Sequence, residues 1–232
     1  MNIEGKIAVV TNGTSGIGLA LAARFIVEGA VVILSGANEK KLKTRAAQIG
    51  ATPIVANTTK KEDVKNLVDK ATKKFGRIDL FVSNICFAGF DNIFSTDNNR
   101  NACWHLNVMS QMYAAKYVLP QMISRGSGYF LNIIPSAGLE EEFHLPLYST
   151  TKHEALSFAE RLVATYRNAG IKVSVLCHGS LRPSLESGNQ FMREKNPEPE
   201  VLMDRIIYGI WKEQFLIYST KRCRNVVRSR AC

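Results

Sequence analysis

The stretch Thr11-Asn12-Gly13-Thr14-Ser15-Gly16-Ile17-Gly18 decides the fold, because it places a glycine-rich turn between an apolar strand and a helix. Apolar residues within 6–11 predict a buried parallel strand, and the residues after Gly16 carry apolar positions at helical spacing. Gly13 permits a tight turn, Gly16 lets the backbone approach a phosphate, and Gly18 lets the helix pack closely on the strand. Because the first helical N–H groups then face an anion, the pattern predicts a site for a dinucleotide's pyrophosphate.

Short apolar segments alternate with amphipathic helical segments along the rest of the chain. Strands are expected at 6–11, 31–35, 53–56, 80–83, 128–134, 172–177 and 215–218. Strands that alternate with helices form a parallel sheet covered on both faces. We therefore expect an α/β fold, a Rossmann-type doubly wound parallel sheet of about seven strands with helices on both faces, whose ligand binds at the carboxyl ends of the strands.

The composition predicts one folded domain. The chain has 232 residues with 46% hydrophobic content, enough to bury a sizeable core, and no apolar run long enough to span a bilayer. It starts on its first strand without a secretory leader, so a cytoplasmic address is expected. We expect a single dinucleotide-binding and catalytic domain over 1–220 and a basic C-terminal tail over 221–232.

Much of the net charge of +10 lies in that tail, where five basic residues stand without an acid: Lys221, Arg222, Arg224, Arg228 and Arg230. Such a tail can bind an acidic membrane surface or nucleic acid, be a solvated end, or cap an oligomer interface. No recognition-helix or aromatic RNA-binding pattern accompanies it, which favours the last two interpretations. The five cysteines are scattered and lack metal-ligand spacing, so reduced thiols and no metal site are expected.

The glycine spacing resembles the Thr-Gly-x-x-x-Gly-x-Gly pattern of the short-chain dehydrogenase/reductase family, and the resemblance runs across nearly the whole chain. It implies one doubly wound domain that transfers a hydride between NAD(P) and a carbonyl or secondary alcohol substrate. It also implies a homodimer or homotetramer that pairs through two long helices, here about 97–124 and 147–169. Apolar residues beyond one core stripe fit such pairing, or a wide core face: Met109, Met112, Tyr113, Phe158 and Leu162.

The candidate chemistry lies in Tyr148-Ser149-Thr150-Thr151-Lys152, at the start of a helical segment. Tyr148 and Lys152 are four residues apart and therefore share one helical face. Tyr208 and Lys212 repeat that spacing. Only Tyr148, however, follows the fifth strand by a short loop, as in the family's active site.

By resemblance, Tyr148 is the general acid or base. A phenol has a pKa of roughly 10, so it needs a neighbouring positive charge to exchange protons near neutral pH. The resemblance gives that role to Lys152, which also hydrogen-bonds the nicotinamide ribose. It identifies Asn107 as the asparagine whose backbone carbonyl holds a water next to the lysine; a buried helix asparagine is the alternative. The cofactor carries the hydride and the protein carries the proton.

The family's catalytic serine falls on Pro135, which has no hydroxyl or N–H to bind the substrate oxygen. Ser136 is the adjacent hydroxyl. If the loop is shifted by one residue, Ser136 enters the site; otherwise one donor to the reacting oxygen is missing. Losing one such donor typically costs about 100-fold to 1000-fold in rate. The catalytic candidates are thus Tyr148, Lys152, Asn107 and Ser136.

Other family positions also differ. Ser83-Asn84-Ile85-Cys86 stands in place of Asn-Asn-Ala-Gly, and Asn57 stands where an aspartate commonly meets the adenine. His178-Gly179 replaces Pro-Gly, and Pro183 replaces a threonine, in a region that normally lines the nicotinamide. His178 is a candidate for proton transfer or a structural histidine. Together these departures favour reduced activity as the alternative to a working enzyme.

Cofactor choice depends on the end of the second strand, where an acid would bind the ribose 2'-OH of NAD(H). Ser35-Gly36-Ala37-Asn38 contains no acid, which favours NADP(H) over NAD(H). The usual arginine is Ala37, so Lys40, Lys41 or Lys43 is the candidate phosphate partner. The residues expected to contact the dinucleotide are Gly13, Thr14, Ser15, Gly16, Ile17, Gly18, Ser35, Gly36, Ala37, Asn38, Asn57, Thr58, Asn84, Tyr148, Lys152 and Gly179.

Three functional classes follow. The first is an NAD(P)-dependent oxidoreductase of the short-chain dehydrogenase/reductase type acting on a small carbonyl or alcohol. The second is a catalytically weakened dinucleotide-binding sensor or interaction protein. The third is a basic-tailed partner protein whose dinucleotide site is incidental. The substrate itself is not written in any motif, because the segment from Gly179 to Pro199 carries no pattern that specifies it.

Overall fold

The computed structural model describes residues 1–84, 94–135, 146–178 and 199–219. Seven strands form one parallel sheet in the order β3-β2-β1-β4-β5-β6-β7. The strands are β1 Ile7–Val10, β2 Val31–Gly36, β3 Thr52–Val55, β4 Leu80–Asn84, β5 Gly128–Pro135, β6 Ile171–His178 and β7 Leu216–Tyr218. The chain winds outward from β1 to β3 and then returns to β4 on the other side of β1. This confirms the doubly wound sheet and puts the switch point between β1 and β4.

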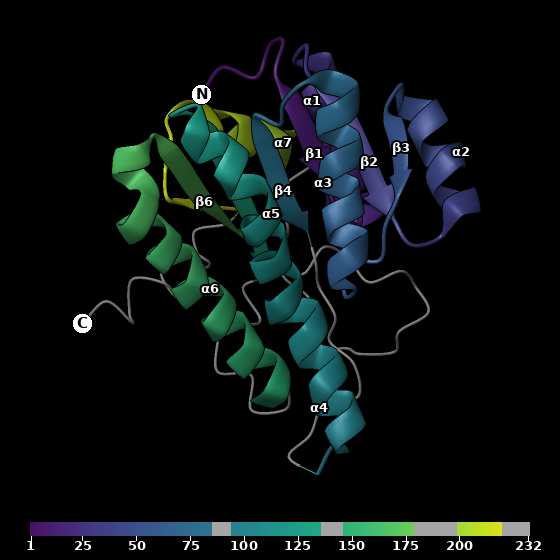
Figure 1. Cartoon of the computed structure of the whole chain (residues 1–232), viewed down its shortest axis with the longest axis vertical. Coiled ribbons are helices and arrows are strands. Elements are labelled where there is room, and N and C mark those ends of the chain that lie inside the picture. The colour runs from purple at the N-terminus through teal and green to yellow at the C-terminus, as the bar shows by residue number, and fades with distance from the viewer. Residues whose placement is uncertain (85–93, 136–145, 179–198, 220–232) are drawn as a thin grey trace.

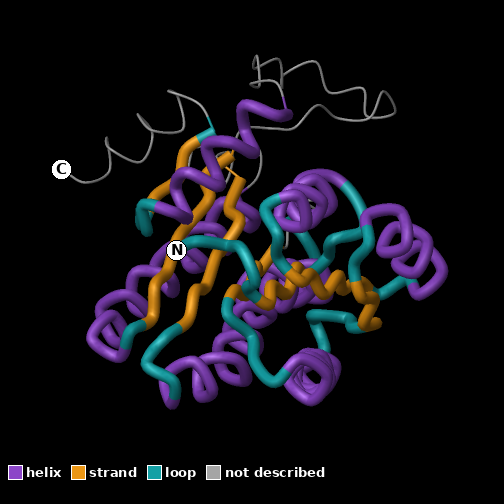
Figure 2. The backbone as a smooth tube through the Cα atoms, turned by 90° about the horizontal axis from the view of Figure 1, so that it is seen from above, coloured by secondary structure: helices purple, strands orange, loops and turns teal. Residues whose placement is uncertain are grey.

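Helices cover both faces of the sheet (Figures 1 and 2). One core cluster joins the sheet to α3, α5 and α6, which lie in front of it in Figure 1, and a second joins it to α1, α2 and α7. The helices are α1 Gly16–Val27, α2 Glu39–Ile49, α3 Lys61–Phe75, α4 Asp97–Trp104, α5 Ser110–Ser124, α6 Pro146–Tyr166 and α7 Pro199–Trp211. A π-helical turn, η1 His105–Met109, joins α4 to α5, and a short 3-10 turn, η3 Arg167–Ala169, follows α6.

The local sequence explains these elements. Every residue of β1 and β4 is buried, as expected for central strands of a parallel sheet covered on both faces. On α3, Val64, Leu67, Val68 and Ala71 are buried at helical spacing. Fully burying one such valine or leucine side chain contributes about 1.5–3 kcal/mol relative to leaving it exposed. The hydrophobic pattern therefore fixes both the type of each element and the face that it buries.

The predicted strands agree with the structure to within one or two residues at either end. The segment 97–124, expected as one helix, is instead divided by η1 into α4 and α5. Leu162, expected among surplus apolar residues, is 6% exposed and belongs to the core. None of the described helices is both long enough and apolar enough to cross a membrane. The basic tail lies outside the described residues.

Candidate active site

The glycine-rich turn connects β1 to α1 at the carboxyl edge of the sheet. The backbone is left-handed at Asn12, with φ 48°, and at Gly16, with φ 55°. Asn12 stands where the family pattern has its first glycine, and asparagine tolerates this conformation better than most residues. The backbone N–H of Gly13 donates to the Ser35 carbonyl at 2.9 Å, which fastens the turn to β2.

Gly13, which the sequence assigns to the tight turn, is also closely packed. A Cβ at Gly13 would lie 2.3 Å from Cδ1 of Leu34, and the positive φ falls on its neighbour Asn12. Gly16 differs, because a Cβ there would meet no atom within 4 Å. Open space beside a left-handed glycine at a helix N-terminus is the geometry that lets a phosphate approach the backbone.

Asn84 ties the end of β4 to this turn. Its Nδ2 donates to the Asn12 carbonyl at 3.1 Å, and its backbone N–H donates to Oγ1 of Thr11 at 3.0 Å. A Cβ at Gly18 would lie 2.2 Å from Nδ2 of Asn84 and 3.1 Å from Cα of Gly13. The structure thus brings Asn84 against the first motif, where its amide supports the turn.

The end of β2 forms a second wall beside the turn. Ser35 is fully buried, and a Cβ at Gly36 would lie 2.8 Å from Cγ2 of Thr14. Ala37 and Asn38 are exposed, and Asn38 caps α2 by accepting from the Lys41 backbone N–H at 2.9 Å. The structure therefore brings the β2 candidates next to Thr14. Ser15 is exposed at the N-cap of α1, whereas Ile17 is buried.

The basic candidates near this wall are not equivalent. Lys43 forms an ion pair with Glu39 at 2.7 Å, one helical turn away, so it already has a carboxylate partner. Lys40 and Lys41 are exposed side chains at the start of the same helix.

Asn57 and Thr58 lie between β3 and α3. The Asn57 side-chain oxygen accepts from the backbone N–H of Thr59 at 3.1 Å and from its hydroxyl at 2.8 Å. The Asn57 backbone N–H donates to the Asp63 carboxylate at 2.9 Å. The Asn57 oxygen therefore shapes this loop, and Thr58 beside it is 9% exposed.

Tyr148 and Lys152 lie together on the buried face of α6. Tyr148 is 2% exposed and Lys152 is 1% exposed, and the lysine Nζ lies 5.5 Å from the centroid of the tyrosine ring. The second pair with the same spacing has a similar distance, with the Nζ of Lys212 5.9 Å from the centroid of the Tyr208 ring, but Tyr208 is 54% exposed on α7. Burial therefore separates the two pairs in the way that the sequence position predicts.

Asn107 lies within the π-helical turn η1 and is 2% exposed. Its Nδ2 donates to Oγ1 of Thr151 at 3.1 Å and to Sγ of Cys103 at 3.3 Å. The Thr151 hydroxyl donates in turn to the Tyr148 carbonyl at 2.9 Å. These contacts fasten the turn to the first part of α6, immediately beside Lys152. π-helical turns are rare and are often found at functional sites.

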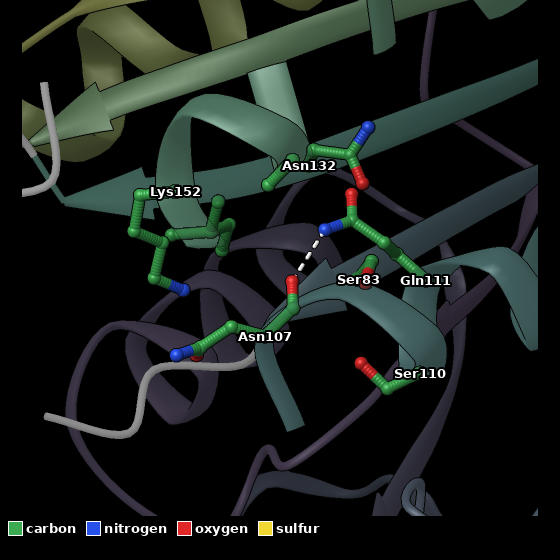
Figure 3. Close-up of a pocket in the computed structure, with 8 residues that line it drawn as sticks. Ser83, Asn107, Ser110, Gln111, Asn132 and Lys152 are labelled. Carbon is green, nitrogen blue, oxygen red and sulfur yellow. Dashed lines mark hydrogen bonds between the residues drawn. The ribbon is translucent and has the colours of Figure 1, made fainter. Parts of the chain in front are cut away.

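A polar cavity of about 10 Å³, roughly the room that one water molecule needs, lies beside Lys152 (Figure 3). It is lined by Ser83, Asn107, Ser110, Gln111, Asn132, Ile133, Lys152 and Ala155. Gln111 Nε2 donates to the backbone carbonyl of Asn107 at 2.6 Å, the contact drawn in Figure 3. Two predicted residues, Asn107 and Lys152, therefore meet at one cavity.

Sequence reasoning missed Ser110, Gln111 and Asn132 as site residues. A signal existed for each: Ser110 and Gln111 follow Asn107 by about one helical turn, and Asn132 is a polar residue inside an apolar strand. Ser136 and Gly179 lie outside the described residues. Pro135, the residue predicted to stand at the family's serine position, is the last residue of β5.

The sheet order and the glycine-rich turn define a Rossmann-like protein of the doubly wound class. A family profile described as short chain dehydrogenase matches residues 6–191. Because this match covers most of the sequence, the chain belongs to the short-chain dehydrogenase family, a family of oxidoreductases, and the resemblance seen in the sequence is confirmed.

Similar curated proteins come from staphylococci. An uncharacterized oxidoreductase of Staphylococcus saprophyticus is 28% identical over 217 residues, covering 90% of this chain and 93% of that protein. One of Staphylococcus aureus strain MRSA252 is 29% identical over 209 residues, covering 88% of this chain and 90% of that protein. Both alignments extend over almost the full length of this chain.

Solved structures share the fold at lower identity. A short-chain dehydrogenase from Streptomyces avermitilis has a TM-score of 0.87 at 21% identity and covers 98% of this chain and 92% of its own. A short-chain dehydrogenase/reductase from Burkholderia phymatum, solved in complex with NAD, has a TM-score of 0.86 at 22% identity, covering 98% of this chain and 93% of its own. At these identities the likeness concerns the fold.

Proposed function

We propose that this protein is an NADP(H)-preferring oxidoreductase that interconverts a small carbonyl compound and the corresponding secondary alcohol. The observation that carries the proposal is the buried pair on α6, with the Lys152 ammonium 5.5 Å from the Tyr148 ring centroid. A positive charge on the same buried helix face as the phenol favours the phenolate, so we expect Tyr148 to exchange a proton nearer to neutral pH than a phenol in water does.

The residues around the glycine-rich turn fit a dinucleotide. Gly16 leaves open space beside left-handed backbone, and the N-terminus of α1 directs its first N–H groups toward that space. Gly13, Thr14, Ser15, Ile17 and Gly18 of the turn, with Ser35 to Asn38, Asn57, Thr58 and Asn84, are the proposed binding residues. When bound, the dinucleotide supplies or accepts the hydride.

The protein's own residues handle the proton. Tyr148 donates it to the carbonyl oxygen during reduction and removes it from the alcohol during oxidation. Lys152 stabilises the phenolate form between these events and orients the ribose. Asn107 lines the same cavity as Lys152, and its backbone carbonyl is assigned to hold a water next to the lysine. Each role rests on the family resemblance together with the burial and contacts of these side chains.

NADP(H) is favoured by the end of β2. Gly36 has no carboxylate that would repel a 2'-phosphate. The residues that follow it, Ala37 and Asn38, are exposed. Lys40 and Lys41 are the proposed phosphate partners, since Lys43 already pairs with Glu39.

Pro135 favours a second candidate function, a catalytically weakened protein that binds the dinucleotide as a sensor. Proline supplies no hydroxyl for the substrate oxygen, and the loss of one such donor costs about 100-fold to 1000-fold in rate. Under this alternative the cofactor binds but turnover is very slow.

Two measurements on the purified protein separate the candidates. Fluorescence energy transfer to nicotinamide on adding NADPH or NADH tests binding, and a panel of small aldehydes and ketones tests turnover. Binding together with turnover supports the oxidoreductase, and binding with none supports the sensor. Absence of binding to either dinucleotide rejects both.

We also propose that the protein forms a homodimer through α5 and α6. Both helices carry half-buried apolar side chains, including Met109 in the adjoining π-helical turn and Met112, Tyr113 and Phe158. Sedimentation of only monomer at micromolar concentration would remove this proposal.

A further inference from the structure

The π-helical turn leaves backbone carbonyls that need donors other than the usual helical N–H groups. The Ser110 backbone N–H bonds the His105 carbonyl five residues back, which is the widened π-helical spacing. Two side chains then serve the next carbonyls. The Ser110 hydroxyl donates to Leu106 at 2.5 Å, and the Gln111 amide donates to Asn107 at 2.6 Å.

Gln111 is placed to do more than cap this turn. It is 5% exposed at the start of α5, and its side chain lies between the Asn107 carbonyl and the Asn132 amide (Figure 3). A carbonyl oxygen can accept two hydrogen bonds, so the Gln111 contact fixes the direction of the Asn107 carbonyl without exhausting it. Asn107 and Lys152 both line the cavity.

Asn132 gives independent evidence that the cavity is a polar site. It is 1% exposed on β5, and neither atom of its amide has a hydrogen-bond partner within the described chain. Buried amides in folded proteins are almost always satisfied. The adjoining cavity has about the room of one water, and a water there would give this amide a hydrogen-bond partner.

Lys152 is the charged group that the contacts around the cavity affect. Among the described residues that line the cavity, Lys152 alone carries a charge, and the others are neutral polar or apolar. Among the described residues, titratable groups in contact with this arrangement include Tyr148, whose ring lies near the Lys152 ammonium, and Cys103, which accepts from Asn107. A buried ammonium surrounded by neutral groups depends on the direction of the dipoles that face it.

We propose that Gln111 is a positioning residue that, with Asn132, fixes the Asn107 carbonyl and a cavity water against the Lys152 ammonium. This inference rests on the proposed function, because it assigns Gln111 to the proton-handling side of that reaction. Gln111 touches neither substrate nor the reacting atoms. It acts by holding the lysine where its charge stabilises the Tyr148 phenolate.

The test replaces the amide while keeping the size of the side chain. Gln111→Met removes the donor to Asn107, and Gln121→Met is the matched control on the same helix. Gln121 donates to Thr72 and accepts from Ile78, far along α5 from the cavity. The titration of Tyr148 is followed by near-ultraviolet tyrosinate absorbance, as the difference between each protein and its Tyr148→Phe counterpart.

Gln111→Met should raise the midpoint of the Tyr148 titration by about one pH unit, because the ammonium is held less firmly beside the phenol. Turnover should fall by roughly tenfold or more, since small misplacements of catalytic groups are costly. NADPH binding should weaken less than in Lys152→Ala, because the lysine itself is still present. Gln121→Met should leave the midpoint and turnover as in the wild type. An unchanged midpoint in Gln111→Met, or an equal shift in both variants, would overturn the proposal.

Gln111→Asn provides the second variant if Gln111→Met does not fold. It keeps a buried amide but is one methylene too short for the Asn107 carbonyl, so the same upward shift is expected, and no shift overturns the proposal. The titration needs no turnover. If Tyr148→Phe left carbonyl reduction unchanged, the proposed function would fail, while the midpoint would still decide the role of Gln111.

Discussion

Pro135, the last residue of β5, lies in register with His178, the last residue of β6. Neighbouring strands in a sheet are separated by about 4.8 Å, so the two residues end adjacent strands at one level. The residues that the sequence predicts at the family's serine position and at the proline of the Pro-Gly pair therefore end adjacent strands side by side. His178 is 8% exposed.

Substitutions at Pro135 and Ser136 separate a working enzyme from a weakened one. If a displaced Ser136 binds the substrate oxygen, Ser136→Ala should lower turnover by roughly 100-fold or more and hardly change NADPH binding. If the protein is catalytically weakened, Ser136→Ala should do nothing, and Pro135→Ser should raise activity by restoring a hydroxyl. Steady-state turnover of both variants distinguishes these two hypotheses. Should neither change a measurable activity, His178 or a bound water becomes the next candidate donor.

Tyr148→Phe should abolish carbonyl reduction and leave NADPH binding nearly intact, because only the proton donor is lost. Lys152→Ala should weaken both, since Lys152 is assigned to the ribose and to the phenolate. Binding by nicotinamide fluorescence and turnover with the same carbonyl panel give the two readouts. Tyr208→Phe, at the exposed tyrosine of the second pair, is the matched control and should change neither. Full turnover in Tyr148→Phe would show that Tyr148 is not the proton donor.

The fold could be predicted because apolar periodicity is strong wherever an element packs against the sheet. β4 and β6 are buried along most of their lengths, and their predicted bounds differ from the structure by one residue at either end. The interruption of the segment 97–124 could not be predicted. Its apolar pattern runs through the π-helical turn, which depends on side-chain donors from Ser110 and Gln111.

Site residues that lie close together in one motif could be predicted from the sequence. Those that meet only because separate elements pack together were missed. Tyr148 and Lys152 are one turn apart on a helix, so spacing alone puts them on one face. Gln111 and Asn132 meet at the cavity only because α5 packs on β5. Asn12 shows a third case, since it is left-handed together with Gly16, and the pattern of glycines does not indicate this for an asparagine.

Gly18→Ala should weaken dinucleotide binding and destabilise the protein. The new methyl group would lie 2.2 Å from Nδ2 of Asn84 and 3.2 Å from the Asn12 carbonyl, so it disturbs the contact that holds the turn. Overpacking of this kind costs about 1–3 kcal/mol. Thermal unfolding and NADPH titration measure the two effects.

Gly50→Ala is the control for Gly18→Ala. Gly50 ends α2 at φ 78° with nothing within 4 Å of a Cβ, so its substitution strains the backbone away from the turn. Gly50→Ala should lower stability and leave NADPH affinity unchanged. If Gly18→Ala binds NADPH as tightly as the wild type does, the turn is not the pyrophosphate site.

Ala37→Arg should increase the preference for NADPH over NADH. Ala37 is exposed at the end of β2, so an arginine there can extend into solvent without a packing penalty. A charge-assisted contact with the 2'-phosphate contributes about 1.5–3 kcal/mol, which corresponds to roughly tenfold or more in affinity. The ratio of dissociation constants for the two dinucleotides is the measurement. Ala37→Gln, similar in length without the charge, should leave that ratio unchanged, and an equal effect of both variants would contradict the assignment.

Tyr129 should make stability fall at high pH. Burial raises its pKa from 10.0 to about 12, and the hydrogen bond with Ser174 opposes part of that rise. The phenolate is disfavoured in the folded protein, so the unfolded chain loses this proton first as pH rises. The stabilisation is complete below about pH 10, where both states are protonated, and is lost as pH approaches about 12. A shift of two units corresponds to about 2–3 kcal/mol.

Tyr129→Phe isolates this contribution. The variant should lose about 1 kcal/mol at neutral pH with its hydrogen bond to Ser174, and its free energy of unfolding should decline less steeply between about pH 10 and pH 12. Denaturant unfolding at a series of pH values gives both quantities. Tyr208→Phe, which removes the hydroxyl of a tyrosine that is 54% exposed, is the control and should leave the free energy of unfolding at neutral pH as in the wild type. Parallel pH profiles for Tyr129→Phe and the wild type would show that the burial of Tyr129 is not the source of the alkaline loss.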